Sequence, residues 1–141
     1  MKKVLIVLLI IMIFTSGCAF RNTRFRDAEM VGVYVSLDTE EVVLNLCGCG
    51  RATLARPYEV IWFDNWDNAR ATGTMRLDVI KDNSSEPIIV EYNFYENILT
   101  LTWLGFDENI FYMISDNVNE GDSFQFKKVG DNQHRIMKCS P

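Results

Sequence analysis

The feature that most limits how this chain can fold is a two-residue alternation of apolar and polar side chains, which continues from about residue 30 onward. Alternation at this period places one face of a strand on the core and the other in solvent, as in antiparallel sheets. It is clearest in five segments, residues 42–46, 75–79, 88–94, 99–103 and 124–126. No stretch shows a convincing helical stripe, which disfavours a fold that alternates strands with helices.

Short polar stretches separate the alternating segments. The shortest connection is Glu96-Asn97, between residues 88–95 and 98–103. A two-residue link with an Asn that tolerates positive φ predicts an antiparallel hairpin. The other turn-prone stretches are residues 38–40, 64–69, 81–87, 105–109 and 115–122. Eight or nine short strands at this spacing predict an all-β domain, a single antiparallel up-and-down β-barrel or a curled meander.

The first 17 residues have a different character. Lys2 and Lys3 precede eleven uninterrupted apolar residues, 4–14, which are too few for a membrane span of about 20 but suit the apolar region of a secretory signal. Gly17 directly before Cys18, after small or permissive residues, resembles the lipobox of bacterial lipoproteins. The resemblance implies cleavage after Gly17 and acylation of Cys18. The alternatives are an ordinary signal peptide and a short buried apolar helix.

These observations predict how the chain is divided and where it is located. We expect a lipoprotein signal peptide at 1–17, a tether at 18–29 after acylated Cys18, a barrel domain at 30–129 and a C-terminal tail at 130–141. Without residues 1–17, the chain has 12 basic and 19 acidic residues, a net charge of −7. An acidic surface repels nucleic acid and anionic lipid, so membrane attachment would depend on the acyl chains. We expect the bacterial cell envelope, the periplasmic side of an outer membrane where the cell has one and otherwise the outer face of the cell membrane.

A second resemblance concerns the barrel domain. It rests on short motifs that occur in this order: Gly32-Val33-Tyr34, Leu44-Asn45-Leu46, Gly50-Arg51-Ala52-Thr53, Thr72-Gly73-Thr74, the late hairpin, and residues 124–129. This order resembles small bacterial lipoproteins with a lipocalin-like β-meander. The resemblance spans most of residues 30–129 and implies a lipocalin-like barrel, with Tyr34 where lipocalins have a Trp.

The cysteines allow several arrangements. With Cys18 acylated, Cys47, Cys49 and Cys139 remain in an oxidising compartment. A disulfide from Cys47 or Cys49 to Cys139 would pin the C-terminal tail to the barrel and stabilise it by about 4–5 kcal/mol. A strained Cys47–Cys49 bridge is a second arrangement. A third is a zinc or cuprous copper site made by the three sulfurs and His134, although Cys-x-Cys with His-x4-Cys is not a standard metal-binding spacing. We expect no cofactor.

A cluster of aromatic residues predicts a recognition surface. Trp62, Phe63 and Trp66 continue from an apolar run into a stretch rich in Asp and Asn. This composition is typical of an interface anchor or of a ligand contact at the mouth of a barrel. The alternative is that a Trp folds back and plugs the end of the barrel.

The sequence contains no catalytic signature. There is no Gly-x-Ser-x-Gly elbow and no glycine-rich phosphate loop. We therefore predict a non-enzymatic, lipid-anchored module that binds another envelope protein, as an inhibitor, immunity factor or assembly accessory. The first alternative is a lipocalin-like binder of a small apolar ligand, although large side chains at inward positions favour a filled barrel. The second is a metal or redox site at Cys47 and Cys49.

Overall fold

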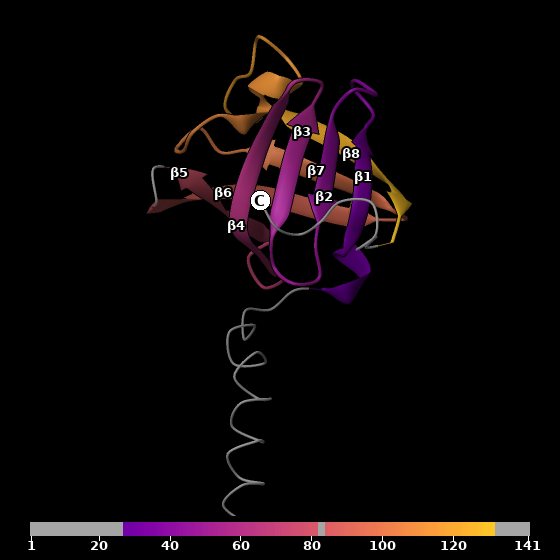
Figure 1. Ribbon diagram of the computed structural model, residues 1–141. Helices are drawn as coiled ribbons and strands as arrows, with labels where there is room; N and C mark the ends of the chain where they lie inside the picture. The colour runs from indigo at the N-terminus through magenta and orange to yellow at the C-terminus, as the bar shows by residue number, and fades with distance from the viewer. Residues whose placement is uncertain (1–26, 82–83, 132–141) are drawn as a thin grey trace, which may run out of the picture.

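The computed structural model describes residues 27–81 and 84–131, and for residues 81, 84 and 85 only the backbone (Figure 1). The chain forms a closed antiparallel barrel of eight strands, each paired with the next, with β8 paired to β1. This confirms the predicted all-β up-and-down barrel. The strands are β1 (Gly32–Ser36), β2 (Val43–Leu46), β3 (Ala52–Arg56), β4 (Glu59–Ala69), β5 (Thr74–Lys81), β6 (Ser84–Tyr95), β7 (Ile98–Trp103) and β8 (Ser123–Gly130).

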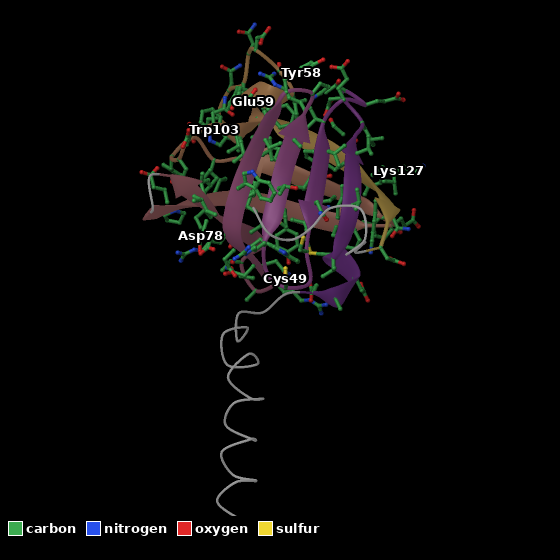
Figure 2. The ribbon with its side chains drawn as sticks, viewed as in Figure 1. Cys49, Tyr58, Glu59, Asp78, Trp103 and Lys127 are labelled. Carbon is green, nitrogen blue, oxygen red and sulfur yellow. The ribbon has the colours of Figure 1, made fainter. Side chains whose placement is uncertain are left out.

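Two short 3-10 helices lie at opposite ends of the barrel (Figure 1). The helix η1 (Ala28–Met30) precedes β1, and the end that carries it is called the N-terminal end here. The helix η2 (Ile110–Met113) lies in the connection from β7 to β8, at the end called the distal end. Figure 2 marks the two ends with Cys49, in the β2–β3 turn at the N-terminal end, and Tyr58, in the β3–β4 turn at the distal end.

Large side chains are buried inside the barrel. The largest fully buried ones include Trp66, Tyr34, Phe63, Phe111, Phe126 and Met30. Met30 comes from η1 and Phe111 from η2, so each short helix sends an apolar side chain into its end of the core. The Tyr34 hydroxyl donates a 2.6 Å hydrogen bond to the Met30 carbonyl, and burial raises the pKa of this phenol. At the other end, the Phe111 ring stacks on Phe124 with centroids 4.7 Å apart.

Turn chemistry and one close approach explain how the barrel closes. Glu96 and Asn97 both have positive φ, 49° and 65°, which confirms the predicted two-residue hairpin between β6 and β7. Gly32 lies where β1 meets β8, and a Cβ atom there would be 2.5 Å from the Gly130 carbonyl oxygen. Only glycine therefore allows the two strands to approach this closely.

Two stretches predicted as loops belong to strands instead. Residues 64–69 form the second half of β4, and residues 84–87 begin β6. In β4 the pairing with β5 shifts between Phe63 and Asn65, so one extra residue is accommodated as a bulge. Phe63 and Trp66 are three positions apart, and the bulge lets both face the core. A simple two-residue period cannot predict this reversal of faces.

Candidate functional site

An apolar groove opens at the distal end of the barrel, between β4, the end of β5 and η2. Its volume is about 400 Å³, and its apolar lining is Val60, Ile61, Trp62, Val79, Ile80 and Ile110. Val60 and Ile80 are exposed, whereas Trp62 is half-buried. Glu108 and Tyr112 complete the lining. The groove therefore combines accessible apolar surface with one carboxylate and one phenol.

The groove exists because β4 and β5 separate before they reach the distal end. Their pairing runs from Ala69 opposite Thr74 to Phe63 opposite Val79. Among the described residues, the four β4 residues before Phe63 have no paired residue in β5. The outward side chains of this unpaired part are therefore left on an open flank of the barrel.

A cluster around Glu59 holds η2 beside the groove. The Tyr112 hydroxyl donates a short hydrogen bond to the Glu59 carboxylate, and Arg56 Nη2 lies 2.6 Å from the same carboxylate. The Arg56 guanidinium also lies over the Tyr112 ring, 5.6 Å from its centroid. The hydrogen bonds from Tyr112 and Arg56 lower the pKa of Glu59, and the bond to Glu59 raises the pKa of Tyr112. We call these three residues the Glu59 cluster.

Exposed apolar side chains gather at the same end. Of the eight large hydrophobic residues that are exposed in the described part of the chain, six lie at the distal end: Leu37, Tyr58, Val60, Ile80, Phe106 and Tyr112. The other two, Tyr95 and Val129, lie near the N-terminal end. Single exposed apolar residues are ordinary on protein surfaces, but a concentration of them is typical of an interaction site.

The N-terminal end carries a polar network. Asn68 is buried, and its Nδ2 donates hydrogen bonds to Asp27 at 2.9 Å and to the Tyr92 hydroxyl at 3.0 Å. The Asp27 amide donates back to Asn68 Oδ1, and Arg70 Nη2 lies 2.6 Å from the Asp27 carboxylate. The hydrogen bond from Arg70 is the main cause that lowers the pKa of Asp27. The network fastens the start of the described chain to β4 and β6.

The structure separates the three residues predicted to form a recognition surface. Trp62 lines the groove, but Phe63 and Trp66 are buried in the core. Trp66 Nε1 donates a 2.8 Å hydrogen bond to the Cys47 carbonyl. For Phe63 and Trp66 the surface prediction is therefore wrong, because the β4 bulge turns both side chains inward. Trp66 instead packs at the N-terminal end, as the alternative of a plugging Trp proposed.

The predicted cysteine site is only partly within the described residues. Cys47 is buried and disulfide-bonded, whereas Cys49 is exposed and free, so these two cysteines are not joined to each other. Cys18, Cys139 and His134 lie outside the described residues. The metal alternative required the Cys47 sulfur as a thiolate, and the disulfide takes up that sulfur. In the described ranges, no group of three or more potential ligands is arranged to hold a metal ion.

Sequence reasoning missed most of the groove. Val60 and Ile80 carried a signal, since residues 60–63 and 79–80 are apolar at consecutive positions and thus on both faces of their strands. That pattern indicates a strand with a second apolar face. The contact of Glu59 with Tyr112 joins residues far apart in the sequence, and no local pattern predicts it.

Comparison with known proteins adds no relative: no protein-family model, curated protein or solved structure matches the chain. Within residues 27–81 and 84–131, no helix has the length and apolar character needed to cross a bilayer. The fold and the groove define the class, a small eight-stranded antiparallel barrel with large buried side chains in its core and an apolar groove at one end.

Proposed function

We propose that this protein is a bacterial lipoprotein of the cell envelope, anchored through Cys18, which acts by binding a partner protein without catalysing a reaction. The observation that carries the proposal is the set of exposed apolar side chains at the distal end, of which Val60, Ile80 and Tyr112 line the groove. An inhibitor, an immunity factor or an assembly accessory would each bind its partner through an exposed surface of this kind.

The anchor would orient this surface. Eight residues separate Cys18 from Asp27, and a chain of this length spans at most about 30 Å. Acylation at Cys18 would therefore keep η1 and the N-terminal end near the bilayer. The distal end lies opposite η1 (Figure 1) and would therefore face away from the membrane, where a second protein can reach it.

The packing of the core favours a protein partner over an enclosed small molecule. A carrier needs an interior lined by small or widely spaced apolar side chains, with room left for the ligand. Here Tyr34, Phe63, Trp66 and Phe126 converge inside the barrel. The accessible apolar surface lies instead on the outer flank between β4 and β5.

Site-specific photo-crosslinking tests the proposal in the native envelope. A photoreactive amino acid is placed in the full-length chain at Tyr58 or Phe106 at the distal end, and at Tyr95 or Val129 as matched controls. The distal positions are expected to give one discrete protein adduct, identified by mass spectrometry, and the controls none. Equal adducts at both ends, or no adduct at the distal positions, would contradict the proposal.

The anchor has its own test. We expect radiolabelled palmitate to enter the wild-type chain and not the Cys18→Ala variant, and the N-terminal peptide of the mature protein to carry acyl groups. A wild-type chain without label would contradict the lipoprotein assignment. That result would not affect the binding surface, which the crosslinking experiment tests independently.

A further inference from the structure

One edge of β4 is free to pair where it borders the groove. The two-residue β3–β4 turn, with Tyr58 at φ 69°, sets Arg56 opposite Glu59. In a turn of this kind the flanking residues form a hydrogen-bonded pair, and along an antiparallel ladder such pairs alternate with non-bonded ones. The alternation directs the N–H and C=O groups of Val60 and Trp62 away from β3, toward the groove.

On the groove side, β5 uses only one of these groups. The β4–β5 ladder begins at Phe63 opposite Val79, and a non-bonded pair at this position places the Ile80 N–H against the Trp62 carbonyl. The Val60 N–H and C=O and the Trp62 N–H have no partner in β5 within the described ladder. The groove between β4 and β5 thus offers two backbone donors and one acceptor, which are flanked by the side chains of Val60, Trp62 and Ile80. A free strand edge beside apolar pockets is the arrangement that binds extended peptides as an added strand.

The charge on the groove wall indicates which charge a bound peptide should carry. Glu108 is exposed on the groove wall, and no ion pair joins it to a basic side chain in the described part of the chain. The nearby Arg56 is already engaged by Glu59 and Tyr112. A basic side chain on the peptide would therefore complement the groove, in keeping with the net charge of −7 on the chain after residue 17.

We propose that the groove binds an extended segment of the partner protein as an added strand on β4. An apolar side chain of this segment packs against Val60, Trp62 and Ile80, and a basic side chain lies beside Glu108. The inference rests on the proposed protein-binding function, and it names the kind of partner segment that the surface recognises.

Synthetic peptides test the strand pairing. The probes are fluorescent peptides of about ten residues in which lysine alternates with valine, isoleucine, phenylalanine or tryptophan. Their binding to the full chain in detergent is measured by fluorescence anisotropy. Alternating peptides are expected to bind at least about tenfold more tightly than block isomers of the same composition. No binding by any alternating peptide would overturn the proposal.

Backbone methylation gives the sharpest measurement. N-methylation at every second residue removes the N–H groups along one edge of an extended peptide, and there are two such patterns. One pattern is expected to weaken binding at least about tenfold, and the other to leave it nearly unchanged, because only one edge pairs with β4. Equal effects of both patterns, or no effect of either, would show that the peptide does not bind as a strand.

Substitutions in the groove test its side chains. Ile80→Asp is expected to weaken peptide binding at least about tenfold, and Val129→Asp, at an exposed site near the other end, to leave it unchanged. Glu108→Lys is expected to weaken binding of the lysine peptides and to permit binding of matched glutamate peptides. Thermal unfolding of each variant verifies its fold. Unaltered charge preference in Glu108→Lys would contradict the assigned role of Glu108.

The outcomes separate this inference from the function on which it rests. Crosslinking at Phe106 is repeated in a chain that carries Ile80→Asp and Glu108→Lys. If the partner is still captured, the protein-binding function stands, but the groove is not the site that binds the partner. A fluorescent fatty acid that binds one-to-one and is not displaced by any peptide would assign the groove to a small apolar ligand. Self-association abolished by Ile80→Asp in sedimentation would assign it to a second copy of this chain.

Discussion

The two ends of the barrel are closed by different kinds of contact. At the N-terminal end, buried Asn68 bonds to Asp27 and Tyr92, and Trp66 bonds to the Cys47 carbonyl. At the distal end, η2 is held by apolar burial and by the exposed Glu59 cluster. The N-terminal end is therefore defined by directional polar contacts, and the distal end by packing with apolar surface left over.

The difference suggests a division of labour. Buried hydrogen bonds are geometrically demanding and specify one arrangement, which suits the end where the chain joins its anchor. Exposed ion pairs are screened by water and stabilise only weakly, so the cap at the distal end can adjust when a partner binds. The following predictions test this contrast between the ends, in order of decreasing effect on stability.

Trp66→Ala is expected to have the largest effect. The side chain is fully buried, so its loss leaves a cavity and removes the hydrogen bond to Cys47. The free energy of unfolding should fall by about 3–5 kcal/mol, measured by urea denaturation. Trp62→Ala, at a half-buried site, is the matched control and should cost less than half as much. Equal losses would mean that Trp66 does not organise the N-terminal end.

Reduction of the Cys47 disulfide comes next. Unfolding in the presence of dithiothreitol is expected to require about 2–4 kcal/mol less free energy than without it. Cys49→Ser serves as the control, because this thiol is free and exposed, and should leave the stability unchanged. Peptide mapping under non-reducing conditions is expected to pair Cys47 with Cys139. A fragment that instead joins Cys47 to Cys49 would refute this pairing.

Asp27→Asn tests the polar network through its pH dependence. Since the Arg70 hydrogen bond lowers the pKa of Asp27 below its ordinary value of 3.8, the carboxylate stabilises the folded state above about pH 4. This contribution is lost as the pH falls through the lower, folded-state pKa. The free energy of unfolding of the variant should be lower by at most about 1 kcal/mol at pH 7, and it should change less with pH below about pH 4. If the stability of the variant depends on acidic pH as that of the wild type does, Asp27 does not contribute to this dependence.

Glu59→Gln is expected to change global stability least while loosening the distal cap. The pKa of Tyr112 should fall toward its ordinary value of 10.0, because the carboxylate that raises it is gone, as followed by ultraviolet titration. Amide exchange in η2 should become faster. Glu108→Gln removes a charge from the same groove and should shift the Tyr112 pKa less. If the Tyr112 pKa shifts more in Glu108→Gln than in Glu59→Gln, the negative charge of the groove, and not the contact with Glu59, controls Tyr112.

The sequence predicted the architecture well because strand alternation and turn chemistry are local. The inward residues of β5, Met75, Leu77 and Val79, follow the two-residue period, and all three are buried. The Glu96-Asn97 hairpin depended only on the φ preferences of adjacent residues. The candidate site was harder to predict, since of the aromatic residues singled out, only Trp62 lies in the groove.

By itself, the sequence determined eight or nine antiparallel strands, arranged as an up-and-down barrel or a curled meander, with a distinct apolar segment before them. Only the tertiary structure decided that the barrel has eight strands and closes on itself, and that β4 bulges after Phe63. It also decided that β4 and β5 separate at the distal end and that Tyr112 reaches Glu59 there. The physical reason is distance along the chain. Alternation and turns depend on neighbouring residues, whereas bulge position, strand separation and long-range contacts depend on how all eight strands pack together.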